Sequence, residues 1–159
     1  MVGKFFLLLL TIFSGWWIYQ TLNSSYSISI NLQANPKTIL TWLTEEEKLL
    51  KWNEGLIQSK IIGDKEINIG FRMRRIYKFN KKELTMFFKL IKFEQNKFVQ
   101  FFVTCEAFTQ TIDIKFKPEN ESTNLQYNVN IEWNNSVSKF FSPLYIIATK
   151  LKLKIIWNN

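Results

Sequence analysis

The sequence has no histidine and only one cysteine among its 159 residues. The absence of histidine removes the commonest general base and the commonest zinc ligand from the chain. Cys105 cannot form an internal disulfide bond, and its position in an apolar run predicts a small buried side chain rather than a nucleophile. Catalysis by histidine and an internal disulfide framework are both excluded.

The sequence also lacks a linker or a shift in composition that would divide it into two folding units. Its 47% hydrophobic and 16% aromatic content suffices to bury one sizeable core at this length. We therefore expect one globular domain over residues 26–159, preceded by an apolar N-terminal segment over residues 1–25.

Acidic residues are in the minority, because 13 Asp and Glu oppose 21 Lys and Arg, which gives a net charge of +8. Such a charge suits nucleic acid or an anionic membrane surface in principle. The lysines are scattered and no nucleic-acid-binding motif accompanies them, so a solvated surface is favoured and no nucleic-acid partner is expected. The run Glu45–Glu47 is typical of the first turn of a helix rather than of a metal cluster. We expect no metal and no cofactor.

The N-terminal segment has no charged residue between Phe5 and Pro36. The stretch "FFLLLLTIFSGWWIYQTL" is long enough to cross a hydrocarbon core of about 30 Å as a helix. It predicts an uncleaved single-pass anchor, and a cleaved secretory signal is the alternative. Lys4 and the terminal amine favour a cytoplasmic N-terminus, which places the domain on the extracytoplasmic side of the membrane.

The first part of the domain combines one strand with two short helices. Tyr26–Leu32 alternates polar and apolar residues and predicts a strand. Asn35 and Pro36 make a favourable helix start, and Thr44 is expected to cap a second helix. Short polar turns then separate strands predicted at Leu56–Ile62, Gly70–Phe79, Leu84–Glu94, Phe98–Phe108, Gln110–Lys117 and Asn124–Trp133.

The last strand has the clearest alternation in the sequence. Polar residues occupy one face, and the other face carries Leu125, Tyr127, Val129, Ile131 and Trp133. This pattern predicts a strand with one face in water and one on a core. Apolar residues then recur at helical spacing from Val137 to Ile155, which predicts a long amphipathic C-terminal helix that Pro143 either starts or kinks.

This order of elements resembles the START-like or SRPBCC superfamily, which includes polyketide cyclase/dehydrase-like and lipid-transfer proteins. The resemblance covers about residues 26–157 and is carried by "SISINLQANPKTILTWLT", "KWNEGL", "EINIGFRMR" and "STNLQYNVNIEW". It departs from the family at Ser122, where glycine is usual, and at Asn159, where the last helix stops without an acidic end. The resemblance implies an α+β helix-grip fold, with a seven-stranded antiparallel curved sheet, two short helices after the first strand and a long C-terminal helix.

In such a fold the space between the curved sheet and the last helix is a cavity. The inward side chains predicted to bind a ligand are Phe71, Met73, Tyr77, Phe88, Phe102, Tyr127, Val129, Ile131, Phe141, Leu144 and Ala148. The polar candidates near that face are Arg75, Glu106, Asp113 and Tyr127. A core filled by these aromatic side chains is the alternative to an open cavity.

Three functions stay open. The first is a membrane-tethered module that binds or carries a small hydrophobic ligand, such as a lipid or an isoprenoid. The second is an enzyme of the cyclase/dehydratase sort, which would need a positioned Glu, Asp or Tyr with a shifted pKa. The third is an interaction module with a solid core that docks a protein partner or the membrane surface. The first is favoured, and an enzyme is not expected.

The apolar segment before Tyr26 generates a first prediction. An uncleaved anchor of this length should keep the full chain in the membrane fraction through carbonate extraction, because its apolar residues stay in the lipid. A soluble product that begins near Ser25 would instead show a cleaved signal. N-terminal sequencing of the extracted and supernatant fractions distinguishes the two results.

Overall fold

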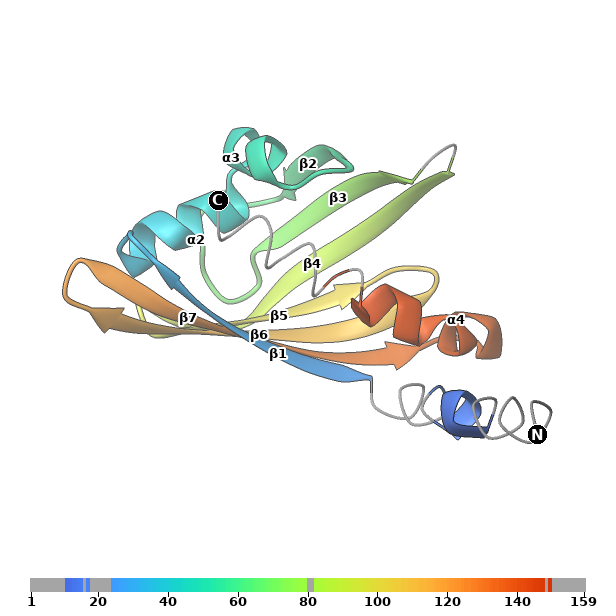
Figure 1. Ribbon diagram of the computed structural model, residues 1–159. Coiled ribbons are helices and arrows are strands. Elements are labelled where there is room, and N and C mark those ends of the chain that lie inside the picture. The colour runs from blue at the N-terminus through green and yellow to red at the C-terminus, as the bar shows by residue number, and fades with distance from the viewer. Residues whose placement is uncertain (1–10, 16, 18–23, 80–81, 148, 150–159) are drawn as a thin grey trace.

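The computed structural model describes residues 11–15, 17, 24–79, 82–147 and 149. In this part of the chain, short helices lie against one face of a curved seven-stranded antiparallel sheet (Figure 1). The elements are β1 Ser25–Leu32, α2 Pro36–Thr44, α3 Glu46–Trp52, β2 Leu56–Ile62, β3 Arg72–Phe79, β4 Lys82–Glu94, β5 Phe98–Thr104, β6 Phe108–Glu119, β7 Ser122–Trp133 and α4 Ser136–Phe140. An α+β fold with a curved antiparallel sheet is confirmed.

The sheet order is β1-β7-β6-β5-β4-β3-β2. Strands β2 to β7 are sequential antiparallel neighbours, whereas β1 pairs with the last strand. The two helices between β1 and β2 therefore connect the opposite edges of the sheet. The helical segment follows a single strand because the chain has to cross from one edge of the sheet to the other.

The start of α2 follows the sequence prediction. The side chain of Asn35 accepts a hydrogen bond from the Thr38 N–H at 2.8 Å, and Pro36 is at the first helical position. The prediction that Thr44 caps the second helix is wrong. Helix α2 continues through Thr44, whose hydroxyl donates to the Leu40 carbonyl at 2.8 Å, and Glu45 is the residue that precedes α3.

Two side chains attach α3 to its surroundings. The Trp52 indole N–H donates to the Trp42 carbonyl at 3.0 Å, which ties α3 to α2. The Glu46 carboxylate accepts from the Ser59 N–H at 2.9 Å, which ties α3 to β2. Helices this short are marginal alone, so these contacts and the burial of Leu49 stabilise them.

The strand predicted over Phe98–Phe108 is too long at its C-terminal end. Strand β5 ends at Thr104, and Cys105 lies in the connection to β6. Cys105 is half-buried, with its thiol 3.4 Å from the Phe108 carbonyl oxygen, and burial raises its pKa. The side chain is partly shielded, although not by a regular strand.

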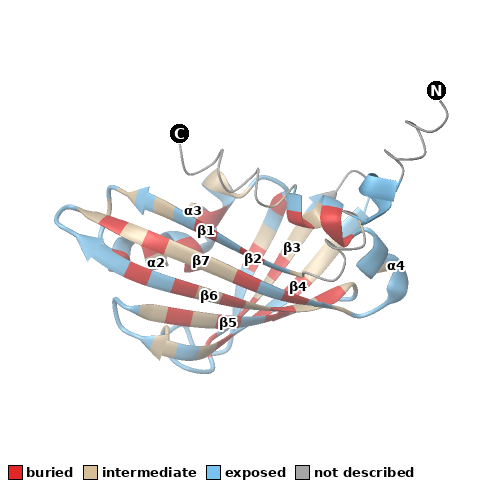
Figure 2. Ribbon diagram, turned by 60° about the horizontal axis from the view of Figure 1, so that its bottom comes forward, coloured by how far each residue is buried: buried red, intermediate tan, exposed pale blue. Residues whose placement is uncertain are grey.

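The alternation predicted for the last strand is confirmed. Val129 and Ile131 in β7 are each 2% exposed, whereas Asn130 and Glu132 are exposed on the opposite face. Figure 2 shows the same alternation of buried and exposed residues along the strands. The buried face of the sheet supplies most of the core, which α2 completes with Ile39 and Leu43.

The C-terminal region differs from the single long helix of the prediction. Helix α4 ends at Phe140, Phe141 forms a turn, and the chain is helical again over residues 142–147. Pro143 lies at the start of the second helical piece, where its missing N–H breaks no hydrogen bond. The predicted continuation over residues 150–157 and the side chain of Ala148 lie outside the described residues.

The predicted anchor, residues 1–25, also lies largely outside the described residues. Within the part that the structure describes, no helix is both long enough and apolar enough to cross a membrane.

The packing of β7 generates a second prediction. Val129→Phe should lower the free energy of unfolding by about 1–3 kcal/mol, because the larger ring has no room in the packed core. Asn130→Phe, on the exposed face of the same strand, should change it by less than about 0.5 kcal/mol. Urea denaturation of both variants measures the difference. A shift of the strand by one residue would exchange the two effects.

Candidate functional site

A cavity of about 600 Å³ lies between the buried face of the sheet and the helices. This volume is in the usual range for small-molecule sites, which are concave and mostly apolar. The described residues that line it are Tyr26, Leu43, Trp52, Asn53, Arg75, Tyr77, Leu84, Met86, Phe88, Phe101, Ala107, Phe108, Gln110, Ile112, Ile114, Tyr127, Trp133, Val137, Ser138, Phe141, Tyr145 and Thr149.

Alternation along the strands explains this lining. Arg75 and Tyr77 are two residues apart in β3, and Leu84, Met86 and Phe88 follow the same period in β4. Residues at this spacing share a face of the sheet. Strands β3, β4 and β6 therefore contribute rows of side chains to the cavity, β1, β5 and β7 add one or two residues each, and residues of the helices close the space above them.

Arg75 is the one charged side chain among the described residues of the lining, and it is only 7% exposed. One terminal nitrogen, Nη2, donates to the Leu43 carbonyl of α2 at 2.5 Å and lies 3.7 Å from the Met73 sulfur. The guanidinium carbon is 4.2 Å from the centre of the Phe88 ring, which is a cation–π contact. The Nε atom is buried without a hydrogen-bond partner.

Four tyrosines line the same space: Tyr26, Tyr77, Tyr127 and Tyr145. Burial raises the pKa of Tyr26, Tyr127 and Tyr145 well above the usual value. The neighbouring Tyr77 raises the pKa of Tyr127 further, and the positive charge of Arg75 lowers it in part. The phenols of Tyr26, Tyr127 and Tyr145 therefore stay protonated near neutral pH and offer hydrogen-bond donors rather than a base.

Aromatic rings form one end of the cavity. The rings of Phe108, Trp133 and Tyr145 lie with centroids 5.2 to 5.6 Å apart, in edge-on or tilted arrangements that aromatic pairs prefer. The Trp133 N–H donates to the Ser24 hydroxyl at 3.1 Å, which holds the ring against the start of β1.

The segment around α4 exposes apolar side chains beside this end. Val137, Phe140, Phe141 and Leu144 are each more than half exposed, and two of them, Val137 and Phe141, also line the cavity. Trp17 packs on Phe140 with ring centroids 5.6 Å apart. The described part of the N-terminal segment therefore contacts the helix at the edge of the cavity.

The structure places four predicted ligand-binding residues at the cavity: Tyr77, Phe88, Tyr127 and Phe141. Four others are packed elsewhere in the core: Phe71, Met73, Val129 and Ile131. The cross-strand neighbours of Val129 are Tyr26 and Ile112. Their larger side chains line the cavity, and the side chain of Val129 does not. Leu144 is 54% exposed, and Ala148 lies outside the residues whose side chains are described.

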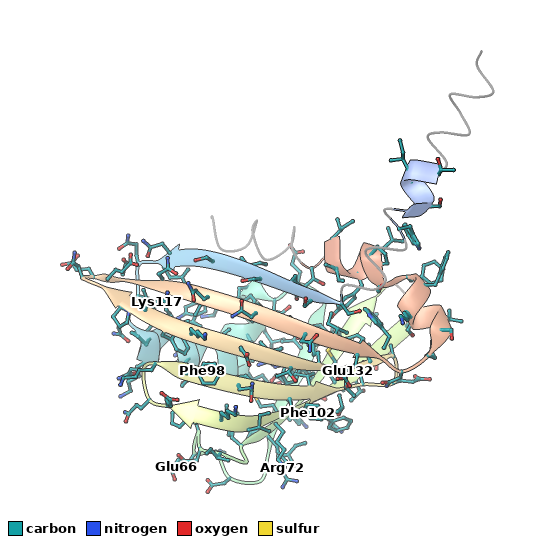
Figure 3. The ribbon with its side chains drawn as sticks, turned by 90° about the horizontal axis from the view of Figure 1, so that it is seen from below. Glu66, Arg72, Phe98, Phe102, Lys117 and Glu132 are labelled. Carbon is teal, nitrogen blue, oxygen red and sulfur yellow. The ribbon has the colours of Figure 1, made fainter. Side chains whose placement is uncertain are left out.

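The prediction that Phe102 points inward is wrong. Phe101 is 4% exposed and lines the cavity, whereas Phe102 is 38% exposed on the outer face that Figure 3 shows from below. Successive side chains of a strand point to opposite faces, so only one of the two phenylalanines can face the helices. Phe102 pairs across the strands with Lys89, which in turn pairs with Arg72.

Of the polar candidates, Arg75 and Tyr127 line the cavity and the two acidic residues do not. Glu106 is exposed in the connection between β5 and β6. Asp113 lies across from Gln100, whose amide donates to its carboxylate at 2.6 Å. The described residues hold no cluster of three or more acidic or cysteine side chains that could bind a metal ion.

Sequence reasoning missed several lining residues, among them Tyr26, Gln110 and Tyr145. Tyr26 begins the alternation of β1, so its period could have placed it on the inner face. Gln110 is 8% exposed, and no pattern marks a buried glutamine before the strand register is known. Tyr145 depends on the turn at Phe141, which sets the direction of the second helical piece.

No family model matches this chain, and no curated protein matches it. Solved structures do match it over most of its length. A START superfamily protein from Mycobacterium smegmatis is 16% identical, with a TM-score of 0.61 over 82% of this chain and 95% of that chain. A protein from Rhodobacter sphaeroides is 11% identical, with a TM-score of 0.67 over 86% of this chain and 88% of that chain.

A third match is a protein from Thermus thermophilus, which is 15% identical, with a TM-score of 0.63 over 84% of this chain and 94% of that chain. Identities this low relate the folds alone. Together with the sheet order and the curved sheet, these matches show that the chain has a START-like fold.

Proposed function

We propose that this chain is a membrane-anchored module that binds a small hydrophobic ligand, such as a lipid or an isoprenoid. The cavity of about 600 Å³ is the observation that carries the proposal. Its lining is mostly aliphatic and aromatic, and an apolar ligand would gain dispersion contacts that these side chains otherwise lack. A START-like fold is consistent with ligand binding in general terms.

The membrane part of the proposal rests on two features. The uncharged run before Tyr26 is long enough for an anchor, and by its flanking charge it would leave the domain on the extracytoplasmic side. The exposed side chains of Val137 and Phe141 line the cavity, and Trp17 contacts the neighbouring Phe140, which is also exposed. An apolar border next to an anchor suits a cavity that takes its ligand from the lipid surface.

An interaction module is the second candidate. Phe87 and Phe102 are 48% and 38% exposed on the outer face, where Lys89 and Arg72 are cross-strand neighbours. Exposed aromatic and basic residues together suit a protein partner or a membrane surface. An enzyme has less support, because the described lining contains no carboxylate and burial raises the pKa of Tyr26, Tyr127 and Tyr145, which keeps these phenols protonated.

Filling the cavity provides a third prediction. Leu84→Trp should prevent ligand binding with little loss of stability, because Leu84 is half-buried and lines the open space. The probes are hexadecanoic acid and hexadecan-1-ol, each with a photoreactive diazirine in the tail, added to the full chain in lipid nanodiscs. Crosslinked peptides identified by mass spectrometry report whether the cavity residues are labelled.

Ile62→Trp is the matched control, since Ile62 is 38% exposed on β2 and does not line the cavity. Labelling of cavity peptides in the parent and in this control, with loss in Leu84→Trp, supports ligand binding. If neither probe labels the cavity of the parent, the interaction module becomes the better candidate.

A further inference from the structure

Arg75 carries a charge inside the cavity that no carboxylate of the described residues neutralises. All 13 acidic side chains belong to the described part of the sequence, and none lines the cavity. An ion pair between two described residues joins Lys48 and Glu45, at 2.9 Å on the surface of α3 and away from the cavity. A cation that is 7% exposed and has no counterion is unusual, because burial of an unpaired charge is costly.

A structural role accounts for only part of this arrangement. The Leu43 carbonyl belongs to the last turn of α2, where carbonyl groups lack helical partners and the helix dipole is negative. Arg75 thus stabilises the end of α2 with one nitrogen. Nε has no partner, and the partial charge of a helix end is about half of an elementary charge.

The other polar side chains of the lining add donors. Tyr127 lines the cavity, and its hydroxyl makes no hydrogen bond to the described residues. Gln110 is 8% exposed, and its amide likewise has no partner in that part of the chain. A cation and hydrogen-bond donors in one cavity, with a lining that is otherwise mostly apolar, form a site for an anionic group attached to a hydrophobic body.

We propose that the ligand is an amphipathic monoanion, a long-chain carboxylic acid or a close chemical relative, whose carboxylate binds Arg75 while its tail occupies the apolar part of the cavity. The guanidinium presents a planar fork that matches the two oxygens of a carboxylate. One cation balances one negative charge, so a singly charged head group is favoured over a neutral or doubly charged one. This inference rests on the proposed function, because it requires that the cavity binds a ligand.

The diazirine probes test it by comparing the acid with the alcohol in the full chain. The acid should label cavity peptides at concentrations on the order of tenfold to a hundredfold lower than the alcohol, because only the acid forms a charge-assisted hydrogen bond with Arg75. Empty nanodiscs give the partitioning of each probe into lipid. Equal labelling by the two probes would contradict the inference and leave the proposed function intact. Labelling by neither would contradict both.

Two variants identify the residue responsible. Arg75→Met should bring acid labelling down to the level of the alcohol while alcohol labelling persists, and the melting temperature should hold or rise because an unpaired buried charge is removed. Arg74→Met is the matched control, since Arg74 directly precedes Arg75 in β3. Its Nη2 donates to Gln58 Oε1 at 3.4 Å, and it does not line the cavity. It should keep the preference of the parent for the acid.

A preference for the acid that survives in Arg75→Met would overturn the inference. A second result would also overturn it: a large loss of stability in Arg75→Met together with equal labelling of the parent by both probes. Arg75 would then serve only to stabilise the end of α2. The comparison of the two probes in the parent decides the question even if Arg75→Met fails to fold.

Discussion

The register between β6 and β7 determines which side chains face the helices. Twelve consecutive residue pairs, from Phe108 opposite Trp133 to Glu119 opposite Ser122, run without a bulge. Because side chains alternate between faces, this unbroken pairing assigns Ile112, Ile114 and Tyr127 to the inner face together. A slip of one residue would bring the asparagines of β7 into the cavity, so the apolar character of the site depends on this pairing.

The helices set the second condition for a cavity. Helices α2 and α3 cross from β1 to β2 at the opposite edge of the sheet, and α2 packs Ile39 and Leu43 into the core. Leu43 of α2 and Trp52 of α3 also line the cavity, so these helices close one side of it. The turn at Phe141 divides the C-terminal helical region into two pieces, so the space beside α4 keeps room among the rings of Phe108, Trp133 and Tyr145.

Arg75 links the two conditions. Its side chain points from β3 to the inner face of the sheet, and its guanidinium donates to a carbonyl at the end of α2. The polar contact stabilises α2, and the remaining positive charge changes the chemistry of a cavity that is otherwise apolar. In a medium of low dielectric constant such a charge acts strongly on any anion that enters, because water does not screen it.

Much of the fold could be predicted from the sequence where a local pattern is strong. The alternation of β7 and the pair Asn35 and Pro36 specified their elements, because strand period and helix capping are local effects. Phe101 and Phe102 stand in a continuous apolar run, where alternation gives no sign of which one faces inward. Met73 shows a second limit of prediction from sequence. Its side chain lies on the inner face as predicted, yet it does not line the cavity, because that depends on how the helices cover the sheet.

The site was predicted less well than the fold, because it depends on tertiary packing rather than on local patterns. Sequence period assigns a side chain to a face, and only tertiary packing decides whether that face is filled or open. Arg75 was among the polar candidates, together with Glu106 and Asp113. That both carboxylates lie outside the cavity depends on strand pairing and on the connection after β5, which no local pattern specifies.

Native mass spectrometry of the full chain, purified gently from the cells that produce it, tests the central claim most directly. The account predicts a co-purifying species that dissociates as an intact amphipathic carboxylic acid and that is absent from the Arg75→Met variant prepared in the same way. A clean apo mass, or a bound lipid that is neutral and equally retained by that variant, would contradict it.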